Sequence, residues 1–208
     1  MCPKIKTVIV YTMSIILGLS VYGCKDWEHD VEKQGIHFKK IHQSAGGTYT
    51  GFMTENRTIQ GFPCEKGWIH FDEDWHLLSF QLSNDFMYNS TLLPAHTWVH
   101  FPFRDSFSGY LCSFPRDLEV QGYLCGGTGG YKGTHTGFYK NGSLRSFYPP
   151  DDVTVQGVPC ASSLLVNVQL YQNGSIKRCK LAREYRSRGK TFKKGTTVNF
   201  DKRGNTNR

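Results

Sequence analysis

Histidine side chains are the groups in this sequence best suited to chemistry near neutral pH. His96 and His100 are four residues apart, so both would lie on one face of a β-strand, and His70 comes in the preceding hairpin. Imidazole nitrogens bind metal ions, and with a carboxylate such as Asp105 they could support acid–base catalysis. Spacing on a strand is a weak signal, however, and most scattered histidines lie on the surface. We therefore expect no metal and no cofactor, and we keep a site on His70, His96 and His100 as an alternative.

The motifs of common enzyme classes do not occur in the sequence. There is no GxSxG nucleophile motif and no HExxH zinc motif. Residues 126–130 are Gly-Gly-Thr-Gly-Gly, like a phosphate-binding loop in composition, but no Lys followed by Ser or Thr closes the segment onto a helix. We interpret this segment as a loose connection and expect a protein without enzymatic turnover.

The first 23 residues have the layout of an export signal. Lys4 and Lys6 precede a mainly apolar run of 14 residues from Val8 to Val21. A membrane-spanning helix needs about 20 residues, so this run is too short to span a bilayer comfortably. A basic start before a short apolar stretch is typical of a cleavable signal peptide. We predict that residues 1–23 are removed and that the mature protein is exported.

The signal ends in Val21, Tyr22, Gly23 and Cys24, which resembles the lipobox of bacterial lipoproteins. In that family the cysteine is acylated and becomes the new N-terminus, although Tyr22 stands where the family has a small or aliphatic residue. The resemblance implies a lipid anchor on Cys24 and a place in the cell envelope, with the outer membrane favoured. Acyl chains bury methylenes at about 0.8 kcal/mol each, so they would hold the chain on a membrane. The alternative is an unlipidated secreted adhesin or effector.

Residues 24–45 are polar and mixed in charge, and we expect them to form a lipid-anchored tether. Ile36, Phe38 and Ile41 could instead form a first strand. Beyond the tether we expect one domain over residues 46–200 and a basic tail at 201–208.

An internal repeat is visible when the sequence is compared with itself. Phe80, Cys112, Phe147 and Cys179 share a column at spacings of 32, 35 and 32 residues, and an acid follows each of them by five residues. Such self-similarity is the signature of a repeat architecture. A second column contains Gln-Gly pairs at 60–61, 121–122 and 156–157, each leading into a cysteine. The copies cover about 57–85, 86–117, 118–152 and 153–184, with a partial copy at 185–205.

Each copy has the pattern of a β-hairpin. In the fourth copy Val166, Val168 and Leu170 alternate with polar residues before Asn173 and Gly174, a pair that accepts the positive φ angles of a turn. A single hairpin is only marginally stable, so neighbouring copies should add edge to edge. We predict an all-β fold of tandem antiparallel β-hairpin repeats in a long twisted or curled sheet. The hairpin with an Asn-Gly turn resembles MORN-type repeats, which implies an architecture and no particular activity.

Five cysteines remain once Cys2 leaves with the signal and Cys24 is set aside. Five cysteines cannot all pair with one another, although export permits disulfides. The alternative is buried thiols, because Phe80 and Phe147 share a column with two of the cysteines. The pairs that the columns favour are Cys160 with Cys179, and Cys112 with Cys125.

The acidic column has two interpretations. Stacked carboxylates along a repeat array can share a calcium ion, but single acids some thirty residues apart make a sparse site. Asp side chains also cap turns by accepting backbone hydrogen bonds. We favour turn capping for the acids of this column, which are Asp85, Asp117, Asp152 and Glu184.

Positive charge is concentrated at the C-terminal end. The chain has a formal net charge of +8, yet residues 177–208 hold 12 Lys or Arg against Glu184 and Asp201. Such a patch could bind an anionic envelope polymer, lipid headgroups or a host surface ligand, whereas export separates it from nucleic acid. The alternative is a solvated end cap that blocks edge-to-edge aggregation. The candidate residues are Lys177, Arg178, Lys180, Arg183, Arg186, Arg188, Lys190, Lys193 and Lys194.

The leading hypothesis is a lipid-anchored envelope protein whose repeat array is a binding or structural module at a membrane. Exposed aromatic side chains on one face would favour binding. An enzyme built on His70, His96 and His100 would require these side chains to converge in a cleft.

Overall fold

The fold is an open antiparallel sheet with short hairpins packed along one side. The computed structural model describes residues 26–102 and 109–206. These residues form 22 strands and no helix, and the paired strands run antiparallel. Twelve strands form one sheet that runs from β1 at one edge to β22 at the other, so the sheet is not closed. The predicted all-β hairpin array is confirmed, in an open rather than a barrel-like form.

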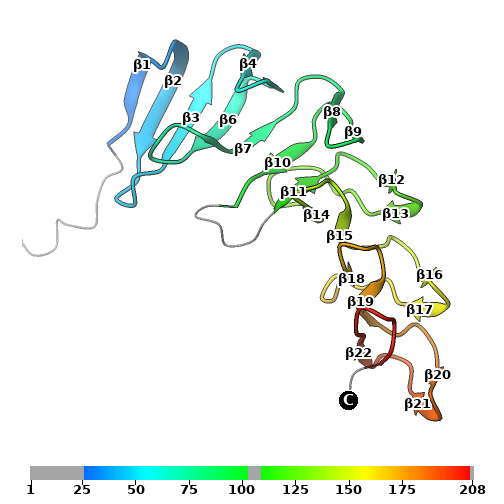
Figure 1. Ribbon diagram of the computed structural model, residues 1–208. Helices are drawn as coiled ribbons and strands as arrows, with labels where there is room; N and C mark the ends of the chain where they lie inside the picture. The colour runs from blue at the N-terminus through cyan, green and yellow to red at the C-terminus, as the bar shows by residue number, and fades with distance from the viewer. Residues whose placement is uncertain (1–25, 103–108, 207–208) are drawn as a thin grey trace, which may run out of the picture.

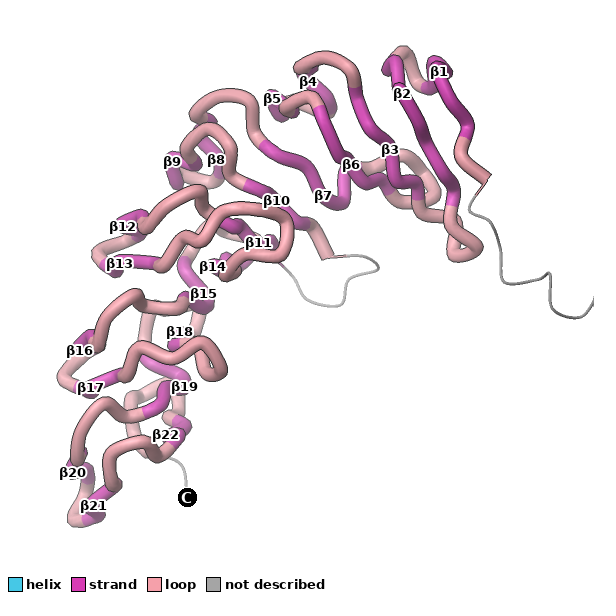
Figure 2. The backbone as a smooth tube through the Cα atoms, turned by 180° about the vertical axis from the view of Figure 1, so that it is seen from behind, coloured by secondary structure: helices cyan, strands magenta, loops and turns pink. Residues whose placement is uncertain are grey.

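Strands of the long sheet alternate along the chain with short hairpins (Figure 1). The long sheet consists of β1 (Glu28–Lys33), β2 (Ile36–Gln43), β3 (Tyr49–Met53), β6 (Gly67–Phe71), β7 (Leu77–Gln81), β10 (Trp98–His100), β11 (Gly109–Ser113), β14 (Thr136–Tyr139), β15 (Leu144–Phe147), β18 (Val168–Leu170), β19 (Ile176–Lys180) and β22 (Thr197–Asn199). The short hairpins pair β4 (Arg57–Ile59) with β5 (Phe62–Cys64), β8 (Phe86–Tyr88) with β9 (Thr91–Leu93), β12 (Leu118–Val120) with β13 (Tyr123–Cys125), β16 (Val153–Val155) with β17 (Val158–Cys160), and β20 (Tyr185–Ser187) with β21 (Lys190–Phe192). Figures 1 and 2 show a curved band with the short hairpins along its outer side.

The sheet begins earlier than the sequence led us to expect. Residues 28–43, which lie within the predicted tether, form β1 and β2, and β2 pairs with β3. Ile36 and Phe38 are buried on the side of β2 that faces the core, and a register shift between Phe38 and Lys40 brings Ile41 to the same side. The alternative prediction of a first strand is confirmed, and the tether prediction is wrong for residues 28–43. At the other end, residues 201–206 of the predicted tail form a turn closed by a bridge between Phe200 and Thr206.

One type of five-residue turn recurs in the long sheet. Its fourth residue has a positive φ angle, for example 84° at Gly142 and 81° at Gly174, a region that glycine enters without steric cost. Trp75 takes the same position with a φ of 65°. The turns predicted at Asn141–Gly142 and Asn173–Gly174 are confirmed. The turn occurs, with the same two backbone hydrogen bonds in each copy, at residues 44–48, 72–76, 139–143, 171–175 and 201–205.

The hydrophobic core lies between the long sheet and the short hairpins. Alternate residues of the sheet strands point to this side, and Phe80, Val99 and Cys112 form one buried row across three neighbouring strands. Two layers thus share one core, as a sheet with one apolar face requires. The short hairpins contribute buried apolar residues of their own, which are Ile59, Cys64, Leu93, Val120, Cys125, Val155, Val158 and Cys160.

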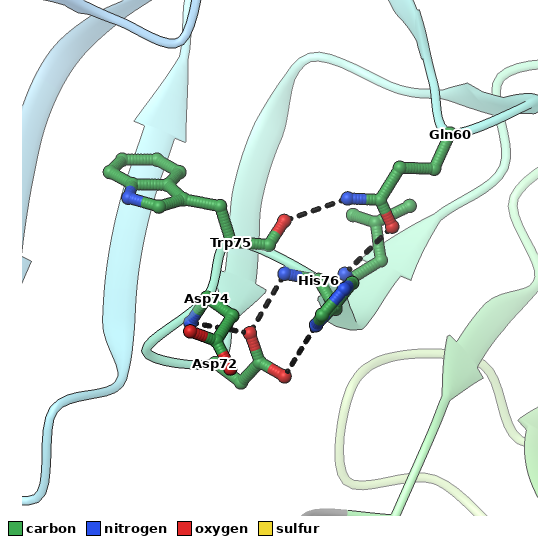
Figure 3. A network of polar contacts seen from close by, with 6 residues as sticks. Gln60, Asp72, Asp74, Trp75 and His76 are labelled. Atoms are coloured by element: carbon green, nitrogen blue, oxygen red, sulfur yellow. Dashed lines mark hydrogen bonds and ion pairs between the residues drawn. The ribbon is translucent and has the colours of Figure 1, made fainter.

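A glutamine side chain at the tip of a short hairpin ties that hairpin to the long sheet. The Nε2 of Gln121 donates to the carbonyl of Gly142 at 2.8 Å, and its Oε1 accepts from the amide of Leu144 at 2.9 Å. One side chain thus pairs a donor and an acceptor at the neighbouring sheet turn. We call this contact the glutamine clamp. The clamp also joins Gln60 to Trp75, as Figure 3 shows, and to Leu77. It joins Gln156 to Gly174 and Ile176.

Two repeats have another residue at the position of the clamp glutamine. Asn89 donates from Nδ2 to the carbonyl of Lys140 at 3.2 Å, within the turn that Gln121 also binds. Arg188 hydrogen-bonds to Asn205 in the last sheet turn. In both cases a polar side chain at the hairpin tip still reaches a turn of the long sheet.

The acidic column caps the base of the short hairpins. In three repeats the Asp Oδ1 accepts a hydrogen bond from the backbone amide ten residues later, at 2.8 to 2.9 Å. Asn56 makes the same contact with the amide of Lys66 at 2.8 Å, whereas Glu184 pairs with Arg186. Turn capping is therefore confirmed for Asp85, Asp117 and Asp152.

Replacing Gln156 with alanine removes two hydrogen bonds that hold hairpin β16–β17 to its sheet turn. We expect the free energy of unfolding to fall by about 1–3 kcal/mol, because each hydrogen bond contributes roughly 0.5–1.5 kcal/mol. Urea unfolding followed by circular dichroism measures the change. The control is Gln172→Ala, an exposed glutamine within the sheet turn itself. Equal losses of stability in the two variants would contradict the clamp.

Candidate functional site

The repeats differ most in the segment that leads from a short hairpin back into the long sheet. This segment has 2 residues after β5, 4 after β9, 10 after β13, 7 after β17 and 4 after β21. Insertions in repeat proteins map to loops on one face, which is often the binding face. The longest segment, residues 126–135, contains the glycine-rich stretch and supplies one wall of the candidate site.

A polar row crosses the sheet on the side opposite the core. Its members are Thr50, His70, Ser79 and His100, which pair residue by residue across β3, β6, β7 and β10, and the apolar Leu111 of β11 pairs with His100 at its end. The next residues along these strands, such as Ile69 and Phe80, are buried in the core. Because side chains alternate along a strand, the polar row points away from the core. We call this side of the sheet the open face.

Two hydrogen bonds hold the imidazole rings of this row in place. The Oγ1 of Thr50 lies 3.1 Å from the Nδ1 of His70, and the Oγ of Ser79 lies 2.6 Å from the Nδ1 of His100. Each bond joins a hydroxyl group on one strand to an imidazole on the next. The Nε2 of His100 is left buried, with no hydrogen-bond partner among the described atoms.

The glycine-rich segment folds over these two rings. The ring centroid of Tyr131 lies 5.2 Å from that of His70 and 5.1 Å from that of His100. The ring of His135 lies 4.9 Å from that of His100. Glycine is required where the segment passes another part of the chain, because a Cβ on Gly127 would lie 2.0 Å from the carbonyl oxygen of Arg116. The segment that we expected to be a loose connection is therefore packed against the open face.

The open face and this segment enclose a pocket of about 610 Å³. No acidic residue lines the part of it that the structure describes. The Nε2 atoms of His100 and His135 are both buried without a hydrogen-bond partner among the described atoms. Unpaired buried polar atoms are costly, so a ligand that pairs with them gains affinity. The lining residues are Thr48, Tyr49, His70, Leu78, Ser79, His100, Phe101, Leu111, Tyr131, Lys132, Gly133 and His135.

The histidines of the polar row favour the neutral form at neutral pH. Burial, with smaller contributions from His135 and His70, lowers the pKa of His100 from 6.5 to about 4. Burial also lowers the pKa of His70. A neutral imidazole has one donor and one acceptor nitrogen. The polar row can therefore both donate hydrogen bonds to a ligand and accept them.

The predicted histidine site is brought together only in part. His70 and His100 share the polar row, but His96 lies in the segment before β10, with its Nδ1 2.8 Å from the Oε2 of Glu65. Asp105 lies outside the described residues. Within the described chain, no three His, Cys, Asp or Glu side chains are grouped to hold a metal ion. Sequence reasoning missed His135, whose only signal is its place at the end of the glycine-rich segment.

The contact between Ser79 and His100 has the chemical composition of a nucleophile and its base. Ser79 is buried, however, and its Oγ contacts Nδ1 of the ring rather than Nε2. The equivalent contact between Thr50 and His70 indicates a cross-strand pair that orders the row. The arrangement is therefore better suited to hydrogen bonding with a ligand than to nucleophilic attack.

Comparison with known proteins does not place the chain in a family. No protein-family model, curated protein or solved structure matches it. Within residues 26–102 and 109–206, no helix is long and apolar enough to cross a membrane.

The five remaining cysteines are buried free thiols in this structure. Burial raises the pKa of Cys64 and Cys125 to about 12, and it also raises the pKa of Cys112. A hydrogen bond with Cys179 is the largest effect that raises the pKa of Cys160, and burial is the next largest. Cys160 and Cys179 are thus in contact, while the disulfides of Cys160 with Cys179 and of Cys112 with Cys125 stay predictions.

The predicted basic patch covers β19, the segment after it, hairpin β20–β21 and the segment before β22. Lys180 is half-buried, and the other eight side chains are exposed. Arg186 is paired with Glu184 at 3.2 Å, and the Nζ of Lys177 lies 5.7 Å from the ring centroid of Tyr171. The predicted lipidation site, Cys24, lies outside the described residues.

Protonation of His100 should destabilise the protein at acidic pH. Its pKa is about 4 in the folded state and 6.5 in the unfolded state, so the unfolded chain binds the proton first as pH falls. The stabilisation is present above pH 6.5 and is lost as the pH falls toward 4, by about 3 kcal/mol at roughly 1.4 kcal/mol per pH unit. Urea unfolding at pH 7 and at pH 4 measures this loss.

The matched variants for this measurement are His100→Asn and His29→Asn, because His29 is exposed on β1. We expect His100→Asn to lose less stability on acidification than the wild type, and His29→Asn to behave like the wild type. The same loss in His100→Asn as in the wild type would show that His100 is not the titrating group.

Proposed function

We propose that this chain is a binding module that takes an acidic saccharide in the pocket on the open face, without turnover, and that it is displayed at a membrane through Cys24. The observation that carries the binding proposal is the pair of buried, unpartnered Nε2 atoms on His100 and His135, two residues that line the pocket together with Tyr131. The pocket volume of about 610 Å³ falls within the roughly 300–1,000 Å³ that is usual for small-molecule sites.

The pocket chemistry favours a sugar ring that carries a negative charge. Tyr49, Phe101 and Tyr131 offer aromatic surfaces on which the apolar face of a sugar ring can pack. The imidazoles can hydrogen-bond to hydroxyl groups, and Lys132 can pair with a carboxylate or a phosphate. An anionic ligand would meet no carboxylate among the described lining residues.

The membrane proposal rests on the lipobox-like sequence at residues 21–24. Strand β1 begins at Glu28, so only three residues separate Cys24 from the sheet. An acylated Cys24 would therefore hold the first strands close to the bilayer surface. Intact mass and detergent partitioning, compared with a Cys24→Ala variant, test this part; acyl mass should be present on the wild type and absent from the variant.

Titration calorimetry tests the binding proposal with two trisaccharides of similar size, trigalacturonic acid and the neutral maltotriose. We expect the acidic sugar to bind and the neutral sugar to bind much more weakly. Tyr131→Ala should weaken binding by about tenfold or more, which corresponds to roughly 1.4 kcal/mol. The control is Leu124→Ala, because Leu124 is also exposed, at 47%, but lies on hairpin β12–β13. Equal binding of the two sugars, or undiminished binding by Tyr131→Ala, would refute the proposal.

A further inference from the structure

Leu164 and Leu165 are the most exposed large apolar side chains of the described chain. They are adjacent in sequence and are 82% and 91% exposed. They lie in the segment 161–167 between β17 and β18, the second longest of the segments that enter the sheet. Figure 1 shows this segment next to the label β18, on the side of the sheet away from hairpin β16–β17. Contiguous exposed apolar patches on a protein surface mark contact sites, and these two adjacent leucines form such a patch.

Hydrogen bonds hold the segment in a turn that presents the two leucines to solvent. The Oγ of Ser163 accepts from the amides of Leu165 and Val166, each at 3.3 Å. At its base, the Oγ of Ser162 donates to the carbonyl of Pro150 at 2.9 Å. The leucines therefore stand at the tip of an ordered turn, which we call the leucine tip.

Basic residues lie at the same end of the sheet as the leucine tip. Strands β18 and β22 both run antiparallel to β19, so the segments that lead into them enter the sheet at one end, about 10 Å apart at two strand spacings. The second of these segments contains Lys193 and Lys194, both exposed. Lys180 is the last residue of β19, and its carbonyl accepts from the amide of Ala161 at 2.7 Å.

Two acids near this end, Asp151 and Asp152, only partly offset the positive charge of Lys180, Lys193 and Lys194. Asp152 accepts a hydrogen bond from the amide of Ser162 at 2.8 Å, at the base of the tip. Glu184 is paired with Arg186. Lys180, Lys193 and Lys194 are in no ion pair among the described residues. An apolar tip beside unpaired lysines complements an anionic bilayer, in which acyl chains lie beneath charged headgroups.

We propose that the leucine tip inserts into the interfacial region of an anionic bilayer while Lys180, Lys193 and Lys194 bind the lipid phosphates. This contact depends neither on acylation of Cys24 nor on a ligand in the pocket. It lies near the β22 edge of the sheet, whereas Cys24 precedes the β1 edge. Eleven strand spacings of about 4.8 Å place the two edges roughly 50 Å apart when measured along the curved sheet (Figure 1). The contact therefore holds the end of the array that is remote from Cys24.

Vesicle sedimentation with the mature chain, which lacks residues 1–23 and carries Cys24→Ala, tests this contact without an acyl anchor or the apolar run of the signal. The probes are vesicles of phosphatidylcholine alone and vesicles that also contain phosphatidylglycerol. We expect binding to the anionic vesicles only, weakening as salt is added. Leu164→Ser with Leu165→Ser should weaken that binding by about tenfold, since interfacial affinity scales with buried apolar area. Lys193→Gln with Lys194→Gln should weaken it and reduce its salt dependence.

The matched control is Met87→Ser with Leu92→Ser, two residues of hairpin β8–β9 that are 60% and 53% exposed. This control should bind anionic vesicles like the parent chain. The proposal is overturned if the parent chain binds neither kind of vesicle, which would leave the tip as a protein-docking site. It is also overturned if the leucine variant binds as well as the control. Neither result bears on saccharide binding by the pocket.

Discussion

A sheet with one apolar face is stable only while that face stays covered, and each repeat of this chain brings its own cover. The short hairpin packs against the sheet, and a polar side chain at its tip fixes it in position, which is the glutamine clamp in three repeats and Asn89 or Arg188 in the other two. Hydrophobic burial alone has no direction, whereas the two hydrogen bonds of the clamp join one hairpin tip to one sheet turn. Repetition of this contact lines up the short hairpins along the outer side of the band in Figure 2.

Covering one face in this way leaves the other face free to vary. The segments that lead back into the sheet differ in length from 2 to 10 residues, while the hairpins themselves change little. The two longest segments form the two surface features that we connect with function. The first encloses the polar row beneath Tyr131, and the second presents the leucine tip beside unpaired lysines. A uniform scaffold can thus carry different contacts at successive repeats.

Features that repeat along the chain could be predicted from the sequence, because each is local to one copy. The Asn-Gly turns and the Asp caps are of this kind. The strand β2 was predicted only as an alternative to a tether, because its buried residues are spaced among histidines and lysines in a polar stretch.

The pocket depends on which strands become neighbours, which no single copy reveals. Strand β7 places Ser79 between His70 and His100, and the fold of residues 126–135 adds His135. Four-residue spacing linked His96 to His100, but the positive φ angle of His96, 64°, belongs to a turn rather than to a continuing strand. The spacing therefore predicted that His96 lies beside His100, whereas in the folded sheet Ser79 lies beside it.

If the covered face stabilises the fold and the open face binds the saccharide, one variant can separate the two roles. Residues 126–135 would be replaced by Pro-Ala-His-Thr, the four residues that occupy the same place at 94–97. Thermal unfolding and titration with trigalacturonic acid are then measured on the same sample. Cooperative unfolding near the wild-type midpoint, with the heat of binding lost, is the expected result. Unchanged binding, or loss of the cooperative transition, would contradict this division between the two faces.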